Sequence, residues 1–335
     1  MDIILYPQSP VPDGCYAATI GFFDGVHCGH QFLLKQLQEE AGARGLKSMA
    51  VTFDRHPRQV VQTGWQPQLL TTLEEKRELL SQTGIDKVVV LPFDKAMAAM
   101  TAQRFMADVL SGRLHASMLL TGYDNRFGHN RSETFTDYKR YGRELGMEVV
   151  CACPLTMGRG AAQIAQHTRQ EELTDRAFSS SLVRRLLSEG DVATAAECLG
   201  RYYSISGQVV HGEHKGHSLG FPTANLLPDD PQKLIPANGA YAVWVTLPDD
   251  GGTHHGGMTN IGTRPTFQGE EQTLETHIFD FTQDIYGQPL RIEFVARLRD
   301  EMPFPSPEAL ARQLSLDKKR AQALLAKLEM RNTGI

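Results

Sequence analysis

The chain has 335 residues, of which 41% are hydrophobic and 22% are charged, and its formal net charge is −5. This length exceeds what one hydrophobic core usually serves, so we expect two domains, and the ordinary composition argues against long disorder. The charge gives no global basic field for nucleic acid, and neither a long apolar run nor a basic and then apolar leader is present, so we expect a cytoplasmic protein without membrane partners.

Apolar stretches alternate with helical patterns in the first half of the chain. Thr72 and Glu75 have the spacing of a capping box at the start of one helix. The alternation predicts a doubly wound, Rossmann-like α/β domain, in which ligands bind beyond the carboxyl ends of parallel strands. Strands are predicted at residues 17–21, 48–53, 87–91, 117–121 and 148–153, and helices at 31–43, 73–82, 102–110 and 136–145.

A glycine-punctuated turn follows the first predicted strand, from Gly21 to His30. A strand, a tight turn and a helix N-terminus place amide donors and a positive dipole end where a triphosphate can lie. His27 and His30 are three residues apart, so they can face one ligand and stabilise the charge that develops when an α-phosphate is attacked. A zinc site is the alternative, but no Cys or carboxylate cluster adjoins these histidines in the sequence.

A serine-rich helix start is predicted further along, at residues 178–184. Ser180 and Ser181 supply hydroxyls, and Arg184 follows about one turn later. This combination can bind the β- and γ-phosphates of a nucleotide through hydrogen bonds and charge. A serine-capped surface helix explains the segment equally well when it is taken alone.

The second half of the chain predicts successive strands without intervening helices. Alternating patterns separated by Gly, Pro and Asp turns favour a compact antiparallel barrel, followed by a helix that begins near Pro307. We place the domain boundary between residues 186 and 187, in a helical connector over 186–200. The predicted strands are 203–210, 240–247, 257–261, 275–281 and 290–298.

The segment 207–225 combines several glycines with the run Pro222-Thr223-Ala224-Asn225. Glycines let backbone amides close on phosphate oxygens, while a hydroxyl and a side-chain amide suit the magnesium that accompanies ATP. A glycine-rich hairpin is the alternative, but it does not require these four residues in this order.

These ordered segments resemble those of the bacterial bifunctional riboflavin kinase/FAD synthetase family. The resemblance rests on two signatures, Gly-Phe-Phe-Asp-Gly-Val-His-x-Gly-His and Pro-Thr-Ala-Asn, and it extends over essentially the whole chain. It implies an FAD synthetase (FMN adenylyltransferase) domain over 1–186 and a riboflavin kinase domain over 187–335. Riboflavin, FMN and ATP would be substrates, FMN and FAD products, and Mg²⁺ the required metal.

The resemblance also implies roles for individual residues. Glu275 would be the catalytic base of the kinase, because the family carries its glutamate in a Glu-x-His strand of this form, and His27 and His30 would be catalytic in the transferase. The transferase would bind nucleotide through Gly21, Phe22, Asp24, Gly29, Ser180, Ser181 and Arg184, and flavin through Asp124, Asn125, Arg126 and Phe127. The kinase would bind nucleotide through Gly212, Gly216, Gly220, Pro222 and Thr223, flavin through Asn260, Gly262, Thr263 and Arg264, and magnesium through Thr223 and Asn225.

Three departures from the family pattern keep an alternative open. Arg55 and Asn125 stand where the family has proline and phenylalanine, and His217 replaces a common arginine or lysine. Because the first two fall in the transferase half, a riboflavin kinase with a degenerate nucleotidyltransferase domain is the main alternative. A flavin-binding store without catalysis is another. We expect a monomer or a weak homo-oligomer without nucleic acid partners.

Overall fold

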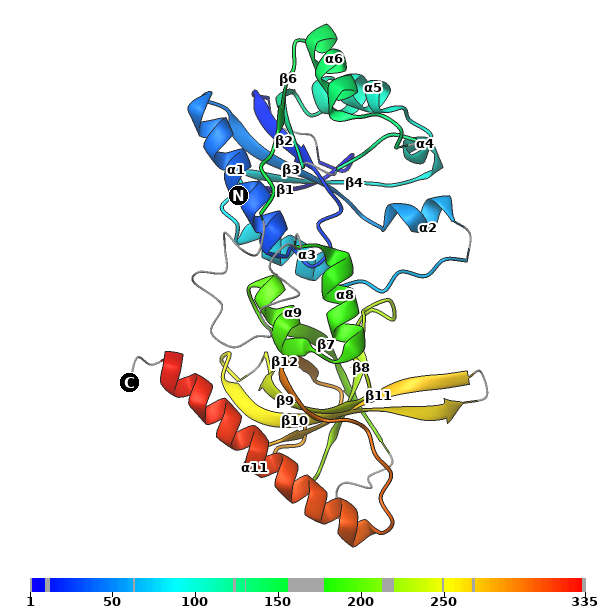
Figure 1. Cartoon of the computed structure of the whole chain (residues 1–335), viewed down its shortest axis with the longest axis vertical. Helices are drawn as coiled ribbons and strands as arrows, with labels where there is room; N and C mark the ends of the chain where they lie inside the picture. The colour runs from blue at the N-terminus through cyan, green and yellow to red at the C-terminus, as the bar shows by residue number, and fades with distance from the viewer. Residues whose placement is uncertain are drawn as a thin grey trace. The chain divides into compact units, whose positions relative to one another are not determined.

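The computed structural model of the chain (Figure 1) describes residues 2–9, 13–62, 64–122, 125–129, 131–155, 178–212, 220–248, 250–266 and 269–332. The chain divides into two compact units, Met1–Ser180 and Ser181–Ile335. The finer boundary at residues 186 and 187 stays a prediction. No helix within the described ranges is both long enough and apolar enough to span a membrane.

The first unit is a parallel sheet with helices on both faces. Its strands lie in the order β1-β4-β3-β2-β5-β6, and every pairing is parallel. The chain therefore runs outward from β2 through β3 and β4, and later returns to the other side of β2 with β5 and β6. This confirms the predicted doubly wound fold. The strands are β1 (Asp2–Leu5), β2 (Tyr16–Ile20), β3 (Lys47–Phe53), β4 (Lys87–Leu91), β5 (Ala116–Thr121) and β6 (Glu148–Cys151).

Helices cover the sheet and bury a core on each side. Leu34, Leu37 and Leu80 pack on one face, whereas Phe105 and Tyr138 pack on the other. The predicted helix at 102–110 is a short α-helix that continues as a π-helix. The helices are α1 (Cys28–Ala43), α2 (Pro57–Val61), α3 (Leu73–Ser81), α4 (Lys95–Ala98), α5 (Ala102–Arg104), the π-helix η1 (Phe105–Ser111) and α6 (Phe135–Leu145).

The second unit is a closed barrel, as predicted, with strands in the order β10-β11-β8-β7-β12-β9. The pairings are antiparallel, so each strand alternates between two faces. The described elements are α8 (Ser180–Glu189), α9 (Val192–Leu199), β7 (Tyr203–Val210), β8 (Ala224–Pro228), β9 (Gly239–Thr246), β10 (His254–Thr266), β11 (Gly269–Ile278), β12 (Pro289–Arg299) and α11 (Pro307–Asn332).

The C-terminal helix α11 lies along the outside of the barrel, where Figure 1 shows it in red. Ala321 and Leu325 are buried against apolar side chains of the barrel strands. Asp317, only 1% exposed, accepts a hydrogen bond of 2.8 Å from Arg299 Nε at the end of β12. Apolar packing and one buried ion pair therefore fix this helix to the barrel.

Candidate active sites

The first candidate site is the turn that leaves β2 at the centre of the parallel sheet. The strand order reverses at β2, and in such sheets the crevice beyond the strand end at this point is the usual place for a ligand. Phe23, Gly25 and Val26 have positive φ angles of 54°, 80° and 38°. Left-handed backbone is costly for phenylalanine and especially for a β-branched valine, and such strain concentrates at functional sites.

Asp24 holds this turn from within. Its buried carboxylate accepts hydrogen bonds from the backbone N–H groups of Leu70 and Thr71, each at 3.0 Å, and from the Thr71 hydroxyl at 3.2 Å. Gly25 N donates to Thr71 Oγ1 at 3.0 Å. The segment before α3 therefore fastens the turn through Asp24, and the predicted nucleotide contact of Asp24 stays a prediction.

The two catalytic histidines predicted from the sequence lie together at the N-terminus of α1. His27 is the N-cap residue, and its Nδ1 accepts a hydrogen bond of 3.3 Å from His30 N. Their rings stack with centroids 3.6 Å apart. Desolvation, and then the charges of His27 and Lys76, hold the pKa of His30 well below its usual value, so this imidazole is neutral.

Glycine between these histidines avoids close contacts that a side chain would make. A Cβ on Gly29 would lie 3.1 Å from Phe178 O and 3.2 Å from the His27 ring. Ser180 Oγ donates to Asp24 O at 2.9 Å, so the first residue of α8 contacts the turn. Ser181 and Arg184 follow on α8, in the second unit, and their phosphate contacts stay predictions.

The predicted flavin segment of the transferase also adjoins the end of β2. Asn125 Nδ2 donates to Ile20 O at 2.6 Å, and Phe127 stacks on Tyr138 with centroids 4.4 Å apart. Arg126 is exposed, and Asp124 lies outside the described residues. Asn125 and Phe127 thus have structural contacts, and flavin binding by this segment stays a prediction.

Sequence reasoning missed a buried lysine behind the turn. Lys76, 2% exposed, donates from Nζ to Phe22 O at 3.2 Å and to Phe53 O at 3.0 Å. The available signal was its position on the core face of α3, four residues before the buried Leu80. A lysine at a core position is rare enough to be noticed.

The second candidate site lies in the barrel, where three predicted residues form a row across neighbouring strands. Glu275 on β11 is directly opposite Asn225 on β8 and Asn260 on β10. Residues opposite one another in an antiparallel pair project from the same face. The predicted base, a predicted magnesium ligand and a predicted flavin residue are therefore adjacent.

One hydrogen bond and one glycine support the Pro-Thr-Ala-Asn segment. His277 Nδ1 donates to Pro222 O at 2.9 Å, and burial lowers the pKa of this histidine, which keeps it neutral. A Cβ on Gly212 would lie only 2.1 Å from Asn225 Nδ2, so glycine at this position makes room for the Asn225 amide. Gly220 has a φ of 78°, and Gly216 lies outside the described residues.

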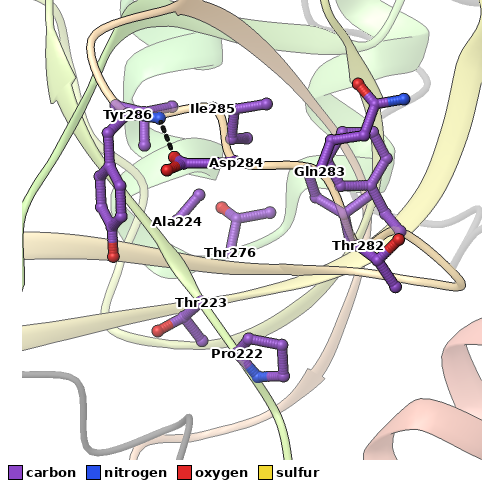
Figure 2. A pocket seen from close by; sticks show the side chains of 12 residues that line it. Pro222, Thr223, Ala224, Thr276, Thr282, Gln283, Asp284, Ile285 and Tyr286 are labelled. Atoms are coloured by element: carbon purple, nitrogen blue, oxygen red, sulfur yellow. Dashed lines mark hydrogen bonds between the residues drawn. The ribbon is translucent and has the colours of Figure 1, made fainter.

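A cavity of about 420 Å³ opens beside this segment. Figure 2 shows Pro222 and Thr223 on one side of it and the loop that carries Asp284, Ile285 and Tyr286 on the other. Asp284 shapes that loop by accepting a hydrogen bond of 3.0 Å from Tyr286 N. The sequence analysis missed this loop. The remaining lining residues are mostly apolar or hydroxyl-bearing: Val209, Ala224, Thr276, Ile278, Phe281, Thr282 and Gln283.

The predicted flavin segment on β10 has polar neighbours of its own. Thr263 Oγ1 accepts a hydrogen bond of 2.6 Å from Asn238 Nδ2, which also donates to Glu301 at 2.9 Å. A Cβ on Gly262 would approach Glu301 Oε1 to 3.0 Å. The backbone of Arg264 pairs with Glu271, while its side chain lies outside the described part of the structure. Flavin contacts here stay predictions.

Family models match both halves of the chain, FAD synthetase over residues 10–164 and riboflavin kinase over residues 199–325. Proteins named bifunctional riboflavin kinase/FMN adenylyltransferase are similar over most of their length. The protein of Escherichia coli K12 is 37% identical over 94% of both chains, and that of Haemophilus influenzae 34% identical over 95% of this chain and 97% of its own. The protein of Bacillus subtilis is 32% identical over 90% of both.

A solved structure described as a macrolide-efflux protein from Streptococcus pneumoniae has the same fold. It superposes with a TM-score of 0.81, is 29% identical, and covers 96% of this chain and 98% of its own. The family models and the full-length relatives agree on a transferase joined to a kinase, which supports the bifunctional prediction over a kinase alone. The chain belongs to the family of bifunctional riboflavin kinase/FMN adenylyltransferases.

Proposed function

We propose that the barrel converts riboflavin and ATP into FMN and ADP, and that the β2 turn converts FMN and a second ATP into FAD and pyrophosphate. The first reaction attacks the γ-phosphorus of ATP and the second attacks the α-phosphorus. Two reactions at different ends of a triphosphate need two differently built sites, which supports one active site in each unit.

In the kinase, the cavity beside Thr223 suits the base and ribose of ATP because it combines apolar walls with a few polar groups. The triphosphate then extends toward Thr223 and the glycine segment. Glu275 accepts the proton of the riboflavin 5′-hydroxyl as its oxygen attacks the γ-phosphorus, and ADP leaves. The observation that carries this proposal is the row of Asn260, Glu275 and Asn225.

The residues near the cavity fit a magnesium ion that is shared with the nucleotide. Thr223 and Asn225 offer hard oxygen donors, as Mg²⁺ prefers. Within the described residues, no group of three or more His, Cys, Asp or Glu side chains could hold a metal by itself. ATP phosphates and water would therefore complete the coordination, and the ion would neutralise charge on the transferred phosphoryl group.

In the transferase, the phosphate of FMN attacks the α-phosphorus of ATP, and pyrophosphate leaves. The turn after β2 and the N-terminus of α1 supply amide donors and a positive dipole end to the triphosphate. His27 and His30 stabilise the charge that develops on the α-phosphate. Gly21, Phe22 and Gly29 bring the backbone close to the nucleotide, and Ser180, Ser181 and Arg184 bind its outer phosphates.

The protein acts on small molecules in the cytoplasm, as a monomer or a weak homo-oligomer. A formal charge of −5 and the absence of a basic composition favour anionic nucleotides held at local sites over binding to nucleic acid.

Chromatography of the products from riboflavin, ATP and Mg²⁺ tests the two sites separately. Glu275→Gln should abolish FMN formation but leave added FMN convertible to FAD, because it removes only the kinase base. His30→Ala should give the reverse result. Glu293→Gln, on β12 of the same barrel, is the matched control and should retain both activities. Loss of both activities in one folded single variant would contradict separate active sites.

A further inference from the structure

We propose that Lys76 is a positioning residue for adenylyl transfer, and that its buried positive charge holds the turn from Gly21 to His27 in the shape that receives a triphosphate. This inference rests on the proposed transferase function. Lys76 lies behind the turn rather than in the ligand crevice, so it acts through the backbone of the turn.

The first step is the place of the ammonium group. Lys76 Nζ donates to Phe22 O, just beyond the end of β2, and to Phe53 O, the last carbonyl of β3. It also lies 4.1 Å from the centroid of the Phe22 ring, within reach of a cation–π interaction. One side chain therefore ties together two neighbouring strand ends and the first aromatic residue of the turn.

The second step is that the turn needs such support. Phe23, Gly25 and Val26 are all left-handed, and two of them carry side chains that disfavour this conformation. Strained backbone persists only where surrounding contacts over-determine it. Those contacts come from one segment, in which Leu70 and Thr71 hold Asp24 and Lys76 holds Phe22.

The third step concerns charge. Among the described residues, Lys76 makes no ion pair, and the charged or titratable groups that face it are Asp24, Asp54 and His30. The carboxylates are engaged elsewhere, because Asp24 binds Leu70 and Thr71, and Asp54 binds Phe93 N and Arg55. These hydrogen bonds leave both carboxylates charged, so Asp24 and Asp54 offset part of the charge of the ammonium. Protonated Lys76 still makes the potential behind the turn more positive than neutral lysine would, which favours a polyphosphate.

Burial makes this cation sensitive to pH. Desolvation lowers the pKa of Lys76 to about 8, although the charges of Asp24 and Asp54 oppose the shift. Loss of the proton removes the charge beneath the turn and the attraction to the Phe22 ring. Adenylyl transfer should therefore weaken as the pH rises through about 8, whereas phosphorylation in the barrel should not follow the same profile.

The test compares kcat/KM for ATP in the two reactions of the same protein from pH 6.5 to 9.5. This ratio reports groups of the free enzyme. FAD formation from added FMN should fall about tenfold between pH 7 and pH 9 relative to FMN formation, following the charged fraction of one group. We call this fall in relative kcat/KM between pH 7 and pH 9 the pH step. Lys76→Gln should form FAD slowly already at pH 7 and lack the pH step. Lys76→Arg should remain active and also lack the step, since a guanidinium stays charged.

Lys87→Gln is the matched control, because Lys87 is also buried but lies at the start of β4, at the end of the parallel strands opposite to the turn. It should keep the wild-type step. Calorimetry of ATP binding at pH 7 and 9 gives a second reading without turnover, and the weakening should appear there too.

The inference is overturned if wild-type FAD formation shows no step relative to the kinase, or if Lys76→Gln retains the wild-type step. Should Lys76→Gln fail to fold, Lys76→Arg decides, since a retained step in that variant contradicts the role of Lys76. Absence of FAD at every pH would instead refute the proposed transferase function itself.

Discussion

At the scale of single residues, the barrel site depends on a glycine that leaves space for a functional amide. A Cβ on Gly212 would overlap Asn225 Nδ2, the amide that stands opposite Glu275. The polar row across three strands therefore requires a position without a side chain on the preceding segment.

We expect Gly212→Ala to reduce riboflavin phosphorylation strongly while leaving FAD formation from added FMN intact. The added methyl group forces Asn225 out of the row, and a displacement of about 1 Å can cost about 100-fold in rate. Steady-state kinetics of both reactions measure this. Gly42→Ala is the control because the space around Gly42 is open, and it should affect neither reaction. An unchanged kinase rate in Gly212→Ala would show that Asn225 tolerates displacement.

Residue types in sequence order indicated much of the candidate site, but they did not reveal which side chains are buried. The spacing of His27 and His30 at a helix start could be read from the residues, whereas Glu275 was indicated only by the resemblance of its Glu-x-His strand to that of the family. Asp24 looks like a ligand in the sequence, yet its carboxylate is occupied by Leu70 and Thr71. That contact spans more than forty residues, and no local pattern contains it.

At the scale of elements, β-branched runs and caps predicted most strands and helices. Thr72 accepts from Glu75 N and thereby confirms the predicted capping box of α3. β1 and β8 were missed because they are short, and because Ala224 and Asn225 have low strand propensity. Their pairing partners, β4 for one and β7 and β11 for the other, supply the hydrogen bonds that make them strands.

The attachment of α11 gives a prediction for this element. Arg299→Met leaves the Asp317 carboxylate buried without its cation, so we expect the barrel to lose about 3–5 kcal/mol of unfolding free energy. The double variant Arg299→Met, Asp317→Leu should recover most of this loss, because no uncompensated charge remains. Urea denaturation of the full chain, followed through the barrel, measures both.

A control for this prediction lies on the same helix. Lys318 pairs with the exposed Asp280 at 3.8 Å, and Lys318→Met should have little effect because exposed pairs contribute little. If Arg299→Met were equally mild, water rather than Arg299 would be satisfying Asp317.

At the scale of the whole molecule, both units contain a histidine that folding keeps neutral. The pKa values of His30 and His277 are lowered from 6.5 by burial, one in each unit. Below pH 6.5 the unfolded chain takes up protons that the folded chain does not bind. The stability contribution is therefore complete above pH 6.5 and is lost as the pH falls through the folded values.

We expect the denaturation midpoints of both units to fall between pH 7 and pH 5, before most carboxylates titrate. His277→Gln should flatten this dependence in the barrel alone, and His30→Gln should flatten it in the parallel-sheet unit alone. Midpoints that are the same at both pH values, or a single variant that flattens both units, would contradict the assignment.

The closure of the barrel has a consequence for which of the two units aggregates first when the protein is heated. Among the described strands, each strand of the barrel has a neighbour on both sides, whereas β1 and β6 form the open borders of the parallel sheet and pair on one side only. Such borders recruit strands from other molecules, and a ring of strands offers none. Aggregation of the heated protein should therefore begin in the parallel-sheet unit, which makes FAD. A cell under thermal stress would then lose its supply of FAD before its supply of FMN.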